Sequence, residues 1–169
     1  QSLNLEKYLP PRELWPDLFL PEEFRDLPEE FNLTELLLEN HLLEGRADCI
    51  AIYFKDEQIT YGEIARQVNR LANSFLNLGI SPRDRVGIRM TNRPEAIVTN
   101  LALLKIGAIP VPVSTLWSAK EIAYVGEDAF LKALVVERSL LDAVLQAENL
   151  PAAGMLIIIV NDLPATNDE

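Results

Sequence analysis

Four short apolar segments start at nearly equal intervals in the second half of this chain, 23, 24 and 23 residues apart. Each is long enough for one β-strand: 85–90, 108–113, 132–136 and 155–160. Helical periodicity fills the intervals, and this alternation predicts an α/β fold with a mostly parallel sheet and right-handed crossovers. The last segment is continuously apolar, as expected for a strand covered on both faces.

A polar helix-start signal follows each of the first three strands. The paired residues lie three positions apart: Asn92 with Glu95, Ser118 with Glu121, and Ser139 with Asp142. The units share no residue pattern, so the even spacing indicates βα units of similar size rather than a true repeat.

A helix and a hairpin are expected in front of these units. The run Asn-Leu-Thr-Glu from Asn32 is typical of a helix start, and Gly45 is a suitable stop for a helix that ends near Glu44. Short apolar segments at 50–54 and 58–60 flank a polar turn, which predicts a β-hairpin.

A longer amphipathic helix is expected directly after the hairpin. From Thr60 onward, apolar residues recur at three- and four-residue spacing until Gly79, a period that predicts a helix with one buried face. Thr60 and Glu63 have the spacing of a capping box, and Gly79 is a suitable stop.

The first 31 residues differ from the rest in composition. They hold five of the 11 prolines together with many acidic side chains, which disfavours regular helix or strand. We predict an irregular arm over residues 1–31 and an α/β unit over residues 32–169. Large apolar side chains such as Trp15 and Phe19 favour an arm that packs across a surface; a disordered arm is the alternative.

Charge and cysteine content exclude several classes of protein. The formal net charge of -11 argues against nucleic acid as a partner, because phosphate binding needs clustered cations. No apolar run approaches the roughly 20 residues that span a bilayer, and the N-terminus does not resemble a secretion signal. We expect a soluble, cytoplasmic protein. The single cysteine, Cys49, precedes an apolar run, which favours a buried thiol.

Two prolines in the second strand segment limit how that strand can pair. Pro110 and Pro112 stand two residues apart, so both missing N–H groups belong to the same side of the strand. Either this strand lies at a sheet edge, or its pairing ends near Pro110 and the loop 114–117 turns toward a cleft. The second interpretation is the favoured one.

No phosphate-binding loop is found in the sequence. The seven glycines are never closer than eight positions, so neither GxGxxG nor GxxxxGK[ST] occurs. Thr91, Asn92 and Arg93 have groups that suit an anion, but helix capping with a solvated arginine is the favoured interpretation.

Other catalytic constellations are also missing from the sequence. His41 is the only histidine; it lies in the first expected helix, far in sequence from a candidate nucleophile, and is interpreted as a packing or surface residue. One histidine and one cysteine cannot form the usual zinc site. We therefore assign no catalytic, cofactor-binding or metal-binding residue to this chain.

Four segments, in order, carry a family resemblance. Together they are similar to core motifs of the adenylate-forming acyl-CoA synthetase superfamily (AMP-dependent synthetases and ligases). The matching residues are Ile59-Thr-Tyr-Gly-Glu-Ile64, Asp84-Arg-Val86, Asn92-Arg-Pro-Glu95 and Leu104-Lys-Ile-Gly-Ala-Ile-Pro-Val-Pro112. The arm from Tyr8 to Pro16 resembles the start of benzoate or 2-aminobenzoate CoA ligases, with medium-chain acyl-CoA synthetases close behind.

The resemblance implies an enzyme that works in two steps. A carboxylate attacks ATP to give an acyl adenylate and pyrophosphate, and the thiol of CoA then displaces AMP, with Mg²⁺ neutralising phosphate charge. The family's phosphate loop, adenine pocket, ribose-binding aspartate and C-terminal lysine have no counterpart in residues 1–169. Leu116 and Trp117 occupy a loop where some relatives carry a basic residue near CoA, so no CoA contact is assigned.

We therefore expect an N-terminal fragment of the ligase's large domain, truncated before the phosphate-binding loop and inactive by itself. ATP, Mg²⁺ and CoA would serve the parent enzyme, which acts on a small carboxylic acid. The fragment's partners would be the remainder of the large domain and the C-terminal domain, and its uncovered apolar faces favour self-association. The alternatives are a fragment of a peptide-synthetase adenylation domain or a luciferase-like enzyme, and a non-catalytic binding or assembly module.

Overall fold

The computed structural model describes residues 9–17, 19, 21, 31–147 and 155–160. Contacts within the chain divide it into two units, residues 1–31 and 32–169. In the described part of the first unit, a 3-10 turn, Arg12–Leu14, interrupts the predicted irregular arm. The indole N–H of Trp15 donates to the carbonyl of Pro10 at 2.8 Å, which links the residues on either side of this turn. The acidic residues Glu22, Glu23, Glu29 and Glu30 of this arm lie outside the described residues.

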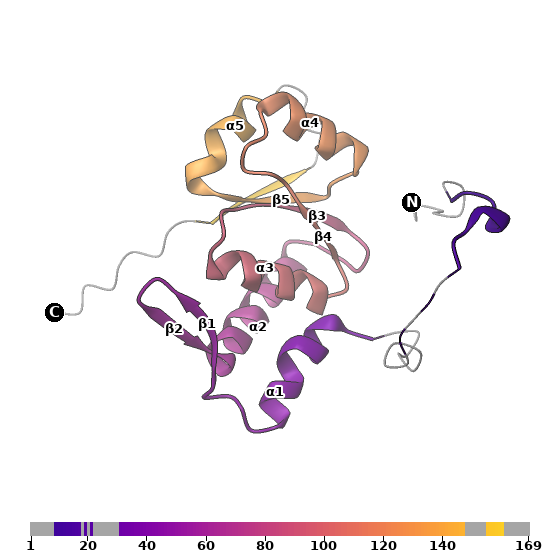
Figure 1. The fold of residues 1–169 in the computed structure, drawn as a ribbon. Helices are drawn as coiled ribbons and strands as arrows, with labels where there is room; N and C mark the ends of the chain where they lie inside the picture. The colour runs from indigo at the N-terminus through magenta and orange to yellow at the C-terminus, as the bar shows by residue number, and fades with distance from the viewer. Residues whose placement is uncertain (1–8, 18, 20, 22–30, 148–154, 161–169) are drawn as a thin grey trace. The chain divides into compact units, whose positions relative to one another are not determined.

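The second unit contains a parallel sheet, as predicted. Its strands lie in the order β4-β3-β5-β6 (Figure 1), and the observed bounds differ from the predicted ones by no more than one residue at either end. They are β3 (Arg85–Arg89), β4 (Ile109–Pro112), β5 (Ala133–Glu137) and β6 (Leu156–Val160).

Helices cover both faces of this sheet (Figure 1). The first face carries α2 (Tyr61–Asn77) and α3 (Pro94–Lys105), and the second carries α4 (Ala119–Asp128) and α5 (Leu141–Leu145). Side chains of the central strand β5 alternate between the two cores: Ala133 and Val135 belong to the first, Leu134 and Val136 to the second. The strand is buried along its whole length, which explains its unbroken apolar sequence.

Capping boxes fix the starts of two helices, both as predicted. The N–H of Glu63 donates to the Thr60 hydroxyl at 3.2 Å, and the N–H of Thr60 donates to the Glu63 carboxylate at 2.8 Å. At α4 the N–H of Ser118 donates to the Glu121 carboxylate at 2.8 Å. Hydrogen bonds from the backbone and then the hydroxyl of Thr60 hold the pKa of Glu63 below its ordinary value.

Gly107 ends α3 in the left-handed conformation, with φ of +74°. The N–H of Ala108 reaches back to the carbonyl of Leu103 at 2.9 Å, which closes the last turn. A Cβ at Gly107 would also lie 3.3 Å from that of Pro82. The helix-to-strand turn within the 104–112 motif therefore requires glycine.

The first helix differs from the expected regular α-helix. A π-helical segment, Glu35–Glu39, precedes a single α-helical turn, α1 (Asn40–Leu43). Its start is tied to α3, because Asn32 Nδ2 donates to the carbonyl of Lys105 at 3.0 Å and the Thr34 hydroxyl to that of Leu101 at 2.8 Å. Sequence patterns do not reveal tethers to a helix about 70 residues away.

The hairpin follows with β1 (Ile50–Phe54) and β2 (Glu57–Thr60), which pair antiparallel as predicted. Cys49 directly precedes β1 and is exposed, so the prediction of a buried thiol was wrong. The pairing of β1 with β2 is irregular between Ile50 and Ile52, at the end of β1 that follows Cys49. His41 packs against Tyr61, with ring centroids 4.3 Å apart.

The two prolines mark a sheet edge, so the favoured interpretation of this strand was wrong and its alternative is correct. Strand β4 pairs with β3 along its whole length, including opposite Pro110 and Pro112. The N–H of Ile109 donates to the carbonyl of Asp84, the residue before β3, at 2.8 Å, and the N–H of Val113 donates to the carbonyl of Ile88 in β3 at 2.9 Å. Along β4 the prolines alternate with the residues that donate to β3. The missing N–H groups therefore lie on the outer edge of β4, away from β3, so the pairing of the two strands loses no hydrogen bond.

Candidate functional site

The carboxyl ends of β3 and β5 form the position where a ligand is expected in such a sheet. These strands are neighbours, yet the chain leaves β3 toward α3 on one face and leaves β5 toward α5 on the other. In open parallel sheets ligands bind in the crevice that opens where adjacent connections diverge in this way. We therefore describe the polar side chains at this edge as the candidate site.

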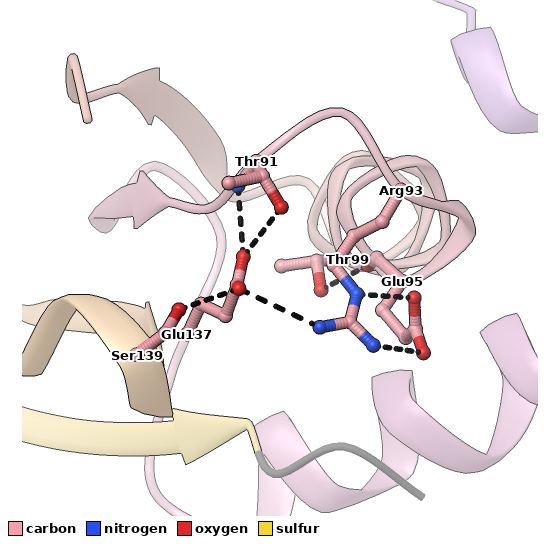
Figure 2. Close-up of polar contacts among 6 residues, drawn as sticks. All are labelled: Thr91, Arg93, Glu95, Thr99, Glu137 and Ser139. Atoms are coloured by element: carbon pink, nitrogen blue, oxygen red, sulfur yellow. Dashed lines mark hydrogen bonds and ion pairs between the residues drawn. The ribbon is translucent and has the colours of Figure 1, made fainter.

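Glu137 lies at the centre of these polar contacts (Figure 2). Its side chain is only 11% exposed. One carboxylate oxygen, Oε2, accepts hydrogen bonds from the N–H of Thr91 at 3.0 Å and from the Thr91 hydroxyl at 2.7 Å. The other, Oε1, accepts one from the Ser139 hydroxyl at 2.6 Å. Both oxygens of this carboxylate are thus engaged by the protein itself.

Arg93 joins this network from the start of α3 (Figure 2). Its guanidinium binds the Glu95 carboxylate through two nitrogens, at 2.8 and 2.9 Å, and Nη1 lies 3.7 Å from Glu137 Oε1. The side chain is 14% exposed, so the prediction of a solvated arginine was wrong. The helix caps predicted at Asn92 and Ser139 are also wrong. The N-cap residue of α3 is Arg93, which makes no side-chain capping bond, and the Ser139 hydroxyl donates to Glu137 instead of capping a helix.

Opposing influences act on the pKa of Glu137. Burial raises it, but hydrogen bonds from Ser139 and Thr91 and the positive charge of Arg93 lower it by more, so the pKa lies below the ordinary value of 4.5. The charged carboxylate is therefore the form that the folded protein stabilises.

This lowered pKa predicts a pH-dependent contribution to stability. A carboxylate whose pKa is depressed on folding stabilises the protein above its unfolded pKa, and that contribution is lost as pH falls through the folded value. Glu137→Gln should therefore be less stable than the wild type near neutral pH, by a margin that shrinks below pH 4.5. Urea unfolding across this range measures the margin. Val144→Ala, which removes no charge, should show a margin independent of pH, and the same behaviour in Glu137→Gln would contradict the prediction.

Arg89 organises the other loop at this edge. It is 2% exposed, and its guanidinium donates to the carbonyls of Ser114, Thr115 at 3.1 Å and Trp117 at 2.9 Å. Burial lowers its pKa. This arginine fixes the loop between β4 and α4 by binding its backbone.

These residues do not fit ATP or Mg²⁺. The cations and hydroxyls that suit a phosphate are already engaged: Arg93 by Glu95 and Glu137, Thr91 and Ser139 by Glu137. Within the described ranges no three His, Cys, Asp or Glu side chains group closely enough to hold a metal ion. The arrangement links strands and loops, and we derive no chemical step from it.

Glu137 and Arg89 were not predicted as residues that organise this edge of the sheet. Each is a charged residue at the carboxyl end of a strand whose interior is uncharged: Arg89 in RVGIR and Glu137 in ALVVE. A charge at such a position requires partners when it is buried. Apart from Ser139, which is close to Glu137 in sequence, those partners lie 25 to 46 residues away, and the sequence does not reveal them.

An open parallel sheet with helices on both faces and polar side chains at its carboxyl edge defines a ligand-binding α/β class. Residues 39–169 match the family of AMP-binding enzymes, and the chain belongs to that family. The adenylate-forming resemblance of its motifs is thereby confirmed. None of the helices in the described part of the chain is both long and apolar enough to cross a membrane.

Relatives include both CoA ligases and peptide synthetases. The chain is 33% identical over 132 residues to a linear gramicidin synthase of Brevibacillus parabrevis, covering 75% of this chain and 2% of the synthase. It is 33% identical over 107 residues to a medium/long-chain-fatty-acid–CoA/3-oxocholest-4-en-26-oate–CoA ligase of Mycobacterium marinum, covering 63% of this chain and 20% of the ligase.

A benzoate CoA ligase from Burkholderia xenovorans LB400 has a similar structure. The TM-score is 0.70 at 27% identity, over 78% of this chain and 26% of that ligase. The chain thus spans about a fifth to a quarter of the length of these two CoA ligases.

Proposed function

We propose that this chain forms the N-terminal part of the large domain of an ATP-dependent acyl- or aryl-CoA ligase. The parent enzyme would convert a carboxylic acid and ATP into an acyl adenylate, and then into a CoA thioester in the cytoplasm. The observation that carries the proposal is the family match over residues 39–169, in a chain that spans only 20% of a CoA ligase relative. The structural likeness to a benzoate CoA ligase supports an aromatic acid as the substrate.

We propose further that residues 1–169 alone are inactive. The polar groups at the carboxyl edge bind one another, which supports a scaffolding role. Sites for ATP, Mg²⁺ and CoA would come from the remainder of the large domain and from the C-terminal domain. Residues 1–31 would form an arm that precedes the α/β unit in the sequence.

A peptide-synthetase adenylation domain is the second candidate. It is favoured by the likeness to the linear gramicidin synthase, which covers more of this chain than the match to the fatty-acid ligase does. Such a parent would activate an amino acid and pass it to a carrier-protein thiol instead of CoA.

Two assays separate these functions. The 169-residue chain, incubated with ATP, Mg²⁺ and benzoate, should release no pyrophosphate above background, and pyrophosphate release would refute the inactive assignment. The product of the complete open reading frame should form AMP and a CoA thioester from benzoate, 2-aminobenzoate or a medium-chain fatty acid. Adenylation of amino acids without thioester formation would instead favour the peptide-synthetase candidate.

A further inference from the structure

Four donor groups from three elements converge on one point in the crevice between β3 and β5. The N–H and hydroxyl of Thr91 come from the end of β3, the guanidinium of Arg93 from the start of α3, and the hydroxyl of Ser139 from the 3-10 turn after β5 (Figure 2). Backbone amides, hydroxyls and a guanidinium are the groups that proteins use to bind carboxylates and phosphates.

Glu137 occupies the point where these donors meet. We propose that its side chain is an internal ligand: the carboxylate fills the anion-binding position of the crevice and thereby clamps β3, α3 and β5 together. The donors of Thr91 and Ser139 are in consequence not available to the carboxylate or phosphate of a ligand. This inference is independent of the proposed function, since it concerns the chain's own residues.

The net charge of the cluster and the hydrogen bonds that Glu137 accepts indicate that this carboxylate is a clamp and not a reactive group. Both Glu137 oxygens accept hydrogen bonds, whereas a general base must keep a lone pair available for its substrate. Glu137, Glu95 and Arg93 together carry one negative charge, which repels a further anion. Removing the Glu137 carboxylate would bring this sum to zero and leave the donors of Thr91 and Ser139, both exposed residues, open to an anion from solution.

Glu137→Ala with sodium acetate tests the inference on the full chain. The substitution should lower the melting temperature by about 5 °C, because it removes the hydrogen bonds of the carboxylate with Thr91 and Ser139 and its charge pairing with Arg93. Acetate should recover much of this loss relative to sodium chloride at the same ionic strength, since its carboxylate can take the vacated position. The wild type and Val144→Ala, a cavity variant without an anion position, control for the general effect of acetate on stability.

An acetate shift confined to Glu137→Ala supports the internal-ligand role. Equal shifts in all three proteins would overturn it. If Glu137→Ala stays unfolded in both salts, the double-mutant cycle of Glu137→Gln with Thr91→Val decides: coupled effects on the urea midpoint support the clamp, and additive effects overturn it.

Discussion

Replacing Gly87 with valine should lower the free energy of unfolding by about 3 kcal/mol, because this position on β3 has no room for a side chain. A Cβ here would lie 2.7 Å from Cδ1 of Leu134 and 2.9 Å from Cδ1 of Leu131. Both leucines are buried, with exposures of 0% and 7%, so they cannot swing into solvent. Urea unfolding followed by far-UV circular dichroism measures the loss.

A double substitution tests the proposed steric cause. Gly87→Ala and Leu134→Ala should each destabilise the chain, but together they should cost less than the sum, since the new methyl group occupies space that Leu134 vacates. The matched control combines Gly87→Ala with Val68→Ala, which lies in the opposite core, and should be additive. Additivity in both pairs would rule out the clash as the cause.

Arg89→Met should cost about 2–3 kcal/mol, because three backbone carbonyls lose a charged hydrogen-bond donor. The loop 114–117 should also loosen locally, which faster hydrogen exchange at Leu116 and Trp117 would reveal. Arg89→Lys keeps the charge but has no planar fork to reach three carbonyls, so an intermediate effect is expected. Unchanged exchange in Arg89→Met would show that the loop holds its position without the guanidinium.

Local sequence patterns predicted most of the fold. The apolar strand segments, the capping boxes at Thr60 and Ser118, and the helix stop at Gly79 depend on residues a few positions apart, so they can be predicted directly from the sequence. The predictions that failed depended on distant contacts. Arg93, which was expected to be solvated, is buried against Glu137, a partner that no local pattern reveals. Asn32 does accept the expected capping bond from the N–H of Thr34 at 2.9 Å, but its second bond, to the carbonyl of Lys105, could not be predicted.

The candidate site was harder to predict for the same reason. Thr91, Asn92 and Arg93 were singled out, yet Asn92 supplies no cap and Arg93 has its charge neutralised by carboxylates. Ser139 was expected to start a helix and instead holds Glu137. Only the sheet order β4-β3-β5-β6 shows that residues near 91 and 137 share one crevice, because it makes β3 and β5 neighbours.

Pro110 and Pro112 have a consequence for how copies of this unit can assemble. The outer edge of β4 cannot donate hydrogen bonds at either proline, while within the described residues β6 is paired only with β5. Backbone pairing between copies is thus restricted to the β6 side. A filament needs two adhesive edges on every copy, so strand pairing by itself would join no more than two copies of this unit.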